Sequence, residues 1–522
     1  MALFANRRGL PFVCPRLRRP RSHRPAPILS TRPHGGWTAA AVIGMPSFRR
    51  TFELHRANGG DAARSATRDR KAVRLLPHRL RPLLLVVIVA LYLAAANGAR
   101  ADDSVSYIRD AEIESTLRTF YNPIFKAAGL DPNAVHVYII NDPQLNSFVA
   151  GGQNIFINTG TIMRSESPNQ LIGIVAHETG HIAGGHLARF DAELHNASIE
   201  SIIAMAVGAG VAALAHGSNA AGGALMAGQE VGLQHILAFS VAQEATADRA
   251  ALTYLDRTHQ SARGLLQFFE ILQQQELLSG IKEVPYLRTH PLTSERIEMI
   301  RNHVEHSPYS NNPDPPEWIE LHKRMKAKLI AFLQPPAQVL EQYPDSDTSI
   351  AARYARAIAY YRMPDLPKAL GLINGLIAAE PKNPYFYELK GQMLFENGHV
   401  QDAVQPYKES VRLAPDVALL RVELAHAEIE TQDLALTRDA LNQLKSADTY
   451  ESQNPDTWRF MAIAYGRLGD MGGSALALAE EAMAEGDKPM AEHQAARAIK
   501  LLPYGPSRLR AEDIRLEAQQ KD

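Results

Sequence analysis

The sequence of 522 residues predicts an α+β module, mostly helical with a small β-sheet, followed by an all-α repeat solenoid. Three observations lead to this prediction. The stretch HETGHIAGGH at 177–186 follows an apolar, helix-like segment, and two β-rich segments precede it. In the C-terminal third, Pro381 and Pro415 stand 34 residues apart within a recurring pattern of large and small side chains. The hydrophobic content of 46% is ordinary for globular chains.

The first 101 residues read as a basic leader. They hold nineteen Lys and Arg against three acidic residues, which leaves 36 basic and 53 acidic residues, a net charge of −17, from Asp102 onward. Residues 83–96 are an apolar core too short for a comfortable membrane span, and Ala99-Arg-Ala101 has a small-x-small cleavage pattern. We therefore expect a secretory signal peptide that is cleaved before Asp102. The long basic stretch indicates a true start nearer Val73, and a mitochondrial presequence is the alternative.

Composition also restricts the environment and the partners. A strongly acidic mature chain argues against nucleic-acid partners. The single cysteine, Cys14, lies in the leader, so the mature protein is expected to have neither disulfides nor a lipidation cysteine.

Two segments before the histidine motif are expected to be β-strands. His136–Ile140 and Asn154–Asn158 are rich in β-branched and aromatic residues and are joined through a segment rich in Pro, Gly and Asn. A strand at the edge of a cleft can pair with an extended substrate backbone. The alternative is a hairpin that only packs on the helix of the histidine motif.

The spacing in the histidine motif predicts a metal site. His177 and His181 are four residues apart, so on a helix both imidazoles lie on one face and reach one ion. Glu178 lies roughly 100° around the same helix, where it can act as the general base of a metallopeptidase. The apolar run from Asn169 to Ala176 predicts that this helix is buried.

His186 is not expected to be a ligand. The pattern H-E-x-x-H-x-x-G-x-x-H is followed as far as Gly184, but its last position is Leu187. On a continued helix His186 would face away from His177. We interpret it as a packing histidine or a neighbour of the ligands.

The missing ligand is expected from a later helix. Glu244 and Asp248 are four apart in an alanine-rich segment, so one helical face presents both carboxylates. One can bind the metal while the other orients a ligand histidine. A solvated acidic face is the alternative for this pair. His195, His216 and His235 are rival third ligands.

Between the two metal motifs, residues 199–215 are apolar except for one glutamate, and a Gly- and Ala-rich stretch follows. The length is at the low end for a membrane span. We expect a mobile apolar lid or a contact with a membrane surface, and a true span is the alternative.

The C-terminal third matches a repeat of paired helices. Between Pro381 and Pro415, the large and small positions fit a tetratricopeptide repeat, and they are Tyr387, Gly391, Leu394, Ala403, Tyr407 and Ser410. Neighbouring segments suggest about four units, whose concave surface is expected to bind protein segments. The predicted boundaries are 1–101 for the leader, 102–312 for the metallopeptidase, 313–346 for a helical linker, 347–504 for the repeats and 505–522 for a charged tail.

Four ordered motifs resemble one family. They are Asn146-Ser147-Phe148 with Gly151-Gly152, the HETGH run, Glu244-Ala-Thr-Ala-Asp248, and Thr289-His290-Pro291 with Arg296. Together they resemble the zinc peptidases related to the HtpX-like and CaaX-prenyl-type enzymes, and most closely the periplasmic β-barrel assembly-enhancing protease (BepA-like) branch. The resemblance covers about Tyr107 to Arg301 of the catalytic part.

The resemblance implies a zincin fold and a role for each motif residue. His177, His181 and Glu244 would bind one Zn²⁺ per chain, and Glu178 would be the catalytic acid and base. Asp248 would be a partner of a ligand or a proton donor. His290 would lie near the metal, where it plugs the open coordination site, stabilises the oxyanion, or only caps the helix that starts near Ser294.

We therefore expect a zinc endopeptidase of the bacterial periplasm that degrades misfolded or stalled envelope proteins. Its expected partners are unfolded or stalled outer-membrane proteins, with the barrel-assembly machinery as a further candidate and peripheral membrane contact as an open option. The alternative function is a chaperone or assembly scaffold with a latent zinc site.

Overall fold

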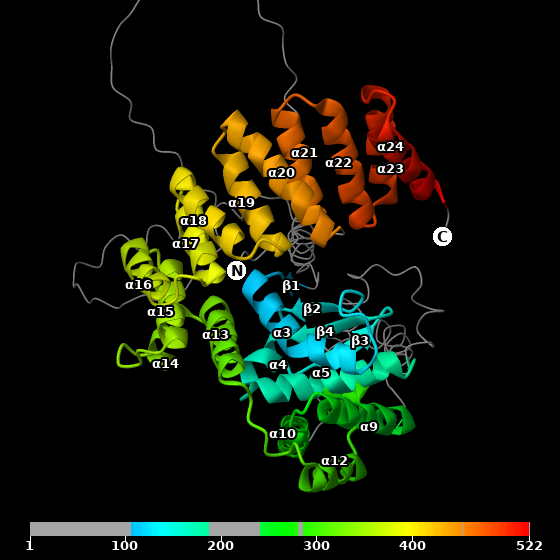
Figure 1. Cartoon of the computed structure of the whole chain (residues 1–522), viewed down its shortest axis with the longest axis vertical. Helices are drawn as coiled ribbons and strands as arrows, with labels where there is room; N and C mark the ends of the chain where they lie inside the picture. Colours follow the sequence, from blue (N-terminus) through cyan, green and yellow to red (C-terminus); the bar gives the residue numbers. More distant parts are fainter. Residues whose placement is uncertain (1–105, 187–240, 280–284, 453, 521–522) are drawn as a thin grey trace, which may run out of the picture. The chain divides into compact units, whose positions relative to one another are not determined.

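The computed structural model describes residues 106–186, 241–279, 285–452 and 454–520 (Figure 1). The expected signal peptide, the apolar segment 199–215 and the rival ligands His195, His216 and His235 lie outside the described residues. In the described part of the chain, no helix combines the length and hydrophobicity needed to cross a membrane.

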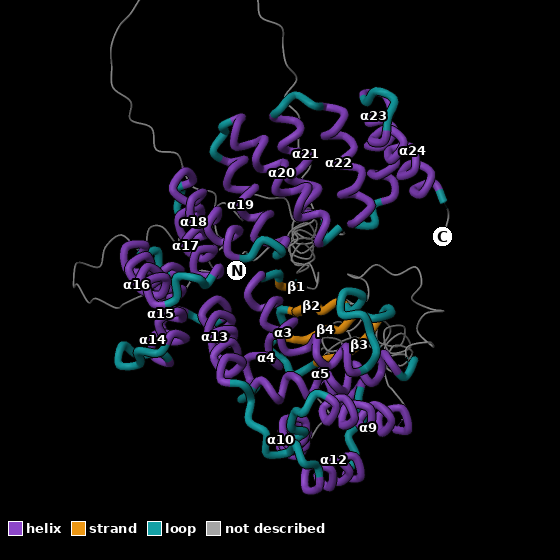
Figure 2. The backbone as a smooth tube through the Cα atoms, viewed as in Figure 1, coloured by secondary structure: helices purple, strands orange, loops and turns teal. Residues whose placement is uncertain are grey.

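The described strands form one small sheet in the order β1-β2-β4-β3. They are β1 (Tyr107–Ile108), β2 (His136–Ile140), β3 (Ser147–Ala150) and β4 (Asn154–Asn158). Figure 2 shows these strands beside the helices that surround them. Strands β2 and β4 coincide with the two predicted strands.

The alternative of a simple hairpin is wrong for these two strands. β2 and β4 pair in parallel, with His136 opposite Asn154. The hairpin is instead β3 and β4, which pair antiparallel and are joined at Gly151 and Gly152. Both glycines have positive φ (58° and 88°), a conformation that favours residues without a Cβ. β3 therefore takes an edge of the sheet that the sequence analysis did not anticipate.

Helix α5 (Pro168–Ala183) is the buried centre of the module and carries the histidine motif. It begins where Ser167 accepts a hydrogen bond from the backbone N–H of Gln170, with Pro168 in the first turn. Every side chain from Pro168 to His181 is buried. The predicted burial of this helix is therefore confirmed.

The other helices of the module pack around α5. α3 (Ala111–Ala127), α9 (Val241–Arg257) and α10 (Arg263–Ser279) each contact it directly. Two short connecting helices complete this part, and they are α4 (Thr159–Arg164) and α11 (Pro285–Thr289). Helix α12 (Ser294–His306) packs on α9 and α10. These contacts bring residues that are more than 100 positions apart to one end of α5.

The segment predicted as a helical linker consists of α13 (Pro316–Leu333) and α14 (Pro336–Gln342). α13 packs on α3 and on the first repeat helix. One hydrophobic core runs from Leu171 in α5 through Met325 in α13 to Phe386 in the repeats. The linker is thus part of the packed structure and not a spacer.

The described repeat helices pair into consecutive hairpins. Their bounds are α15 (Ile350–Arg362) with α16 (Leu366–Ala379), α17 (Pro384–Glu396) with α18 (Val400–Leu413), α19 (Ala418–Glu430) with α20 (Leu434–Tyr450), α21 (Pro455–Arg467) with α22 (Met471–Ala484), and α23 (Lys488–Leu501) with α24 (Pro506–Gln519). The contact predicted at the small positions is present, because a Cβ on Gly391 would lie 2.8 Å from the Tyr407 ring. This geometry is that of the predicted helical repeat.

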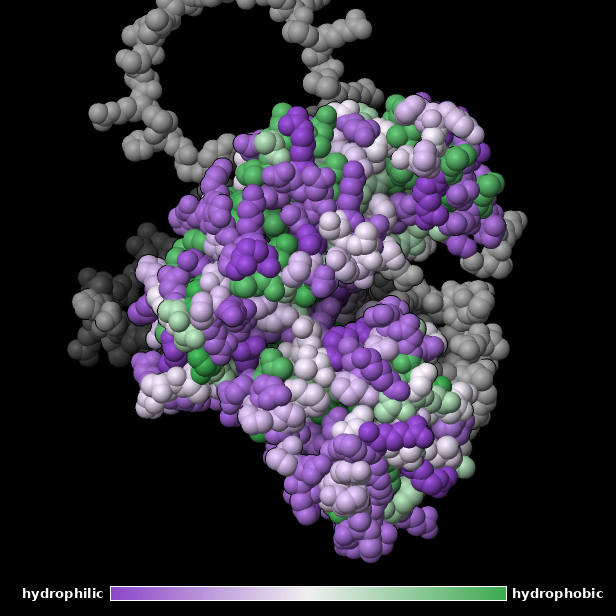
Figure 3. All heavy atoms as spheres, viewed as in Figure 1, coloured by the Kyte–Doolittle hydropathy of each residue, from purple (hydrophilic) through white to green (hydrophobic). Residues whose placement is uncertain are grey.

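The end of the chain differs from the expected charged tail. Residues 506–519 form α24, which buries Ala511 and Ile514 against α22 and α23. The many charged residues of this segment suggested a solvated tail, but two of its apolar residues are buried and pack the helix on the solenoid. In the view of Figure 3, hydrophilic residues predominate over the surface and hydrophobic ones are interspersed among them.

Candidate metal centre

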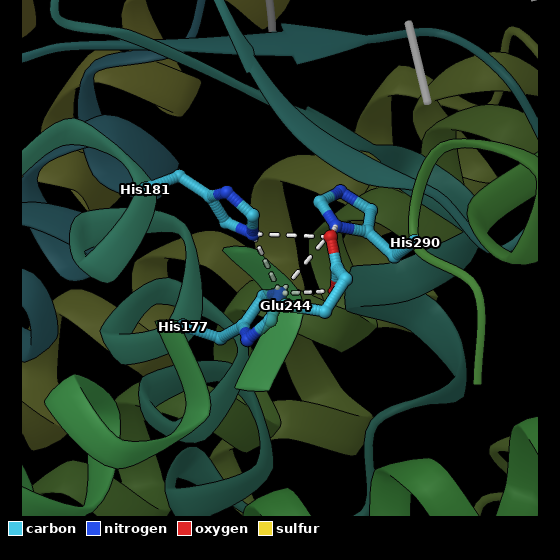
Figure 4. Close-up of side chains that lie close together, drawn as sticks. All are labelled: His177, His181, Glu244 and His290. Carbon is cyan, nitrogen blue, oxygen red and sulfur yellow. Dashed lines mark hydrogen bonds and ion pairs between the residues drawn. The ribbon is translucent and has the colours of Figure 1, made fainter. Parts of the chain in front are cut away.

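Four fully buried side chains converge at the C-terminal end of α5. His177, His181, Glu244 and His290 each direct one nitrogen or oxygen atom into a group whose members lie within 4.8 Å of one another. Figure 4 shows the three imidazoles and the carboxylate pointing toward one point. The Nε2 atoms of His177 and His181 are 3.1 Å apart, as expected for residues one helical turn apart.

The carboxylate of Glu244 completes this group from α9. Its Oε1 lies 3.4 Å from Nε2 of His181, and its Oε2 lies 3.4 Å from Nε2 of His177. Two imidazoles and one carboxylate are a donor set that zinc and similar divalent ions accept, and they leave a position open for other ligands.

Asp248 occupies a different place from Glu244. Its Oδ1 lies 2.8 Å from Nδ1 of His177, the ring nitrogen that faces away from the convergence point. An aspartate there accepts the Nδ1–H hydrogen bond and keeps Nε2 unprotonated for a metal. Asp248 is therefore placed to orient a ligand and is not itself in the group of four.

Glu178 lies beside the convergence point and is fully buried. Among the described residues, neither of its carboxylate oxygens accepts a hydrogen bond, and its Oε1 is 3.6 Å from Nε2 of His290. Burial raises the pKa of Glu178 above its usual range, against the lowering effect of His290 and His177. A carboxylate whose pKa is raised and whose oxygens accept no other hydrogen bond is suited to accept a proton from water.

The neighbouring charges move the other pKa values in opposite directions. Burial opposes protonation of His177, but its contacts with Asp248 and Glu244 raise its pKa to about 9. Burial lowers the pKa of His181, and the nearby His177 and His290 lower it further. Burial acts to raise the pKa of Glu244, but His290 and His177 outweigh it and the pKa falls.

The residues present fit a divalent cation. Glu178, Glu244 and Asp248 bring three negative charges into a region that solvent does not reach, and Arg296 brings one positive charge. Buried charges require compensation. With neutral histidines, a doubly charged cation would make the sum of these charges zero.

The site geometry agrees with sequence comparisons. Residues 108–304 match the profile of peptidase family M48. This range includes both metal motifs and His290.

This segment is similar to the peptidase domain of family M48.

Two relatives match a longer part of this chain. One is the β-barrel assembly-enhancing protease of Yersinia pestis, 23% identical over 371 residues, which are 69% of this chain and 74% of the relative. The other is the protein of the same name from Shigella flexneri, 24% identical over 342 residues, which are 64% of this chain and 68% of the relative. With its buried His and Glu group, the chain is a metalloprotease.

One solved structure is similar to part of this chain. It is the crystal structure of YrrB, a TPR protein with an unusual peptide-binding site, at 15% identity and a TM-score of 0.28. The match covers 33% of this chain and 89% of that one.

His290 enters the M48 metal centre from the turn between α11 and α12. Its Nδ1 lies 3.0 Å from Oε1 of Glu244 and 3.4 Å from Nε2 of His177. The alternative that it caps α12 is wrong, because Thr293 is the capping residue and accepts the backbone N–H of Arg296.

His186 lies on the far side of His181. Helix α5 ends at Ala183, and Gly185 has a positive φ of 62°, so the chain turns back instead of continuing as a helix. Nδ1 of His186 comes within 3.1 Å of Nδ1 of His181. The prediction that His186 faces away assumed that the helix continues past Ala183, and that assumption was wrong. Because the helix ends there, His186 lies beside the candidate ligand His181 and outside the group of four.

Tyr286 is a residue of the site that the sequence analysis did not consider. Its ring stacks on His290 with centroids 4.6 Å apart, and it is 1% exposed. The phenol oxygen has no hydrogen-bond partner among the described residues. The spacing Tyr-x-x-x-His could have indicated this contact from the sequence, because residues four apart on a helix are neighbours.

Proposed function

We propose that the protein is a zinc endopeptidase of the periplasm that degrades misfolded or stalled outer-membrane proteins, which its repeats recruit. The observation that carries the proposal is the buried group of His177, His181 and Glu244 with the open carboxylate of Glu178 beside it. The relatives' printed name, β-barrel assembly-enhancing protease, supports the class of client.

In this proposal His177, His181 and Glu244 hold the ion, and Asp248 keeps His177 in the tautomer that binds it. When bound, the ion supplies Lewis acidity. Glu178 takes the proton of the attacking water and passes it to the amine that leaves. Edge strand β3 offers backbone groups with which an extended substrate can pair, a mode that depends little on side-chain sequence.

We also propose that His290 plugs the site at rest. Its contacts at the candidate metal group support this proposal, because Nδ1 lies 3.0 Å from Oε1 of Glu244 and 3.4 Å from Nε2 of His177. A substrate carbonyl and the histidine would then compete for one position. His290→Ala should raise proteolysis of casein while zinc is retained. A lower turnover with zinc retained would instead assign His290 to oxyanion support.

The test of the main proposal uses the full mature chain. We expect about one zinc per chain in the wild type and in Glu178→Gln, with casein degradation lost only in the latter. Replacement of His177 by Ala should remove the metal, and His186→Ala should retain it as the matched control on the same motif. A Glu178→Gln variant that still degrades casein would refute the role of Glu178.

The scaffold alternative makes a different prediction for the same variant. If the zinc site is latent, cells that carry Glu178→Gln should assemble outer-membrane proteins as well as the wild type. If proteolysis is the function, the variant should fail in the same assay. Growth and outer-membrane protein levels in a strain that depends on this chain would distinguish the two.

A further inference from the structure

Arg296 of α12 links three parts of the metal centre. Its side chain is 2% exposed and reaches the carboxylates of Glu244 and Asp248 in α9. It also donates a hydrogen bond of 2.7 Å from Nη1 to the backbone oxygen of Pro291, the residue after His290. The face of Phe269 lies 4.9 Å from the guanidinium carbon and covers one side of the charged group.

The contact with Asp248 is a two-pronged ion pair. Nε donates to Oδ2 at 2.6 Å and Nη2 donates to Oδ1 at 2.9 Å. A planar guanidinium that binds both oxygens fixes the plane of the carboxylate as well as its position. Because Oδ1 of Asp248 also lies 2.8 Å from Nδ1 of His177, that plane sets the orientation of the His177 ring.

The contact with Glu244 has a comparable consequence. Nη1 lies 2.8 Å from Oε2 of Glu244. The other oxygen, Oε1, faces His181 at 3.4 Å and His290 at 3.0 Å. One arginine thus restrains a candidate ligand directly and a second candidate ligand, His177, through Asp248.

We propose that Arg296 is a positioning residue that pre-orients Glu244 and the Asp248–His177 pair for metal binding, and that the shape of its guanidinium is required in addition to its charge. This inference rests on the proposed metal site. Without the arginine, the buried carboxylates of Glu244 and Asp248 would keep only their histidine contacts, and no group would fix the planes of the two carboxylates. Ligand orientation would then have to be established at each binding event.

The test separates charge from shape. Arg296→Lys keeps a positive charge but cannot bind both oxygens of Asp248 in one plane. Zinc affinity is measured by competition with a chromogenic chelator on the full mature chain. We expect binding to weaken by roughly 10–100-fold, the usual effect of removing a group that orients a ligand. The melting temperature of the metal-free chain should stay close to that of the wild type.

Arg301→Lys is the matched control. Arg301 lies on the same helix, is 36% exposed and pairs with Glu270 and Glu298 on the surface. Its zinc affinity should stay within about twofold of wild type, since surface ion pairs contribute little. If Arg296→Lys binds zinc as tightly as Arg301→Lys does, the proposed role is wrong.

A second variant covers the case in which Arg296→Lys does not fold. Asp248→Asn combined with Arg296→Met removes both charges of the two-pronged ion pair, and Glu244 keeps its contacts with His181 and His290. This double variant should fold and lose zinc affinity by a similar factor, whereas wild-type affinity would contradict the proposal.

A wild-type chain that binds no zinc would refute the metal site itself, and with it the role of Arg296. A zinc-binding wild type with an unchanged Arg296→Lys would refute the role of Arg296 alone.

Discussion

Two buried histidines have pKa values that are shifted in opposite directions. His177 has carboxylate neighbours, Asp248 and Glu244, which raise its pKa to about 9 in spite of burial. His322 in α13 has instead the hydroxyl of Ser165, at 2.7 Å, and the cationic Lys326 nearby. Burial, and to a smaller extent Lys326, lower the pKa of His322 to about 3. The neighbours, not burial alone, therefore decide whether a buried histidine holds a proton.

The pKa of His322 predicts a loss of stability in mild acid. Its folded-state pKa lies below the ordinary value of 6.5, so between these values the unfolded chain binds a proton that the folded chain does not. Stability should therefore fall as the pH decreases from about 6.5 toward 3, by up to about 1.4 kcal/mol per pH unit.

His322→Gln removes the titration and retains a donor for Ser165. Urea unfolding at pH 7, 6 and 5 should show a smaller loss of stability in this variant than in the wild type, with a difference of roughly 2 kcal/mol accumulated by pH 5. Parallel pH profiles for the two proteins would show that His322 does not govern the acid response.

At the scale of elements, two glycines of α5 set how closely its neighbours approach. A Cβ on Gly180 would lie 2.7 Å from the backbone oxygen of Ala247 in α9. A Cβ on Gly173 would lie 2.8 Å from the backbone nitrogen of Leu265 in α10. The two positions are seven residues apart, which is about two helical turns. α9 carries Glu244, whereas α10 carries none of the four candidate ligands.

Gly180→Ala should therefore weaken zinc binding as well as stability. The added methyl group meets backbone atoms, so α9 must move and Glu244 moves with it. We expect a cost of about 1–3 kcal/mol in stability, as for other overpacked sites. Gly173→Ala is the control, with a similar stability cost and nearly unchanged zinc affinity. Equal losses of zinc affinity in both variants would contradict a specific role for the contact between α5 and α9.

At the scale of the whole molecule, buried charges join the M48 domain to the first repeats. Lys328 of α13 is fully buried, and its Nζ lies 2.9 Å from Oδ2 of Asp110 at the start of α3. The same atom lies 3.4 Å from Oε2 of Glu112 and 3.4 Å from Oε2 of Glu388 in α17. The hydroxyl of Tyr354 in α15 donates to Glu112 at 2.8 Å. Catalytic and repeat parts thus share one polar cluster inside a continuous core.

Lys328→Met should loosen this connection. It leaves three buried carboxylates without their shared cation, a change that costs about 3–5 kcal/mol when one partner of a buried ion pair is removed. Thermal unfolding should occur at a lower temperature and separate into two transitions, one for each part. Lys323→Met is the control, because Lys323 is exposed on the same helix and pairs only with Glu320 among the described residues. A single transition at the wild-type temperature would contradict the prediction.

Local patterns in the sequence were sufficient for much of this protein. The shared faces of His177 with His181 and of Glu244 with Asp248 follow from helix periodicity alone. The bounds of β2 and β4 follow from their β-branched and aromatic residues. The repeat hairpins could be predicted from small and large residues at fixed offsets in the sequence. This is possible because each hairpin contacts only its neighbours along the chain. Where contacts are local, the sequence by itself determined the element and the face that it presents.

Only the tertiary structure decided which distant segments meet. The parallel pairing of β2 with β4 and the return of His186 onto His181 depend on turns and contacts that no local period encodes. The docking of α24 and the shared cluster around Lys328 likewise require partners far away in the chain. The physical reason is that burial and charge compensation are properties of the assembled core, whereas periodicity is a property of each segment.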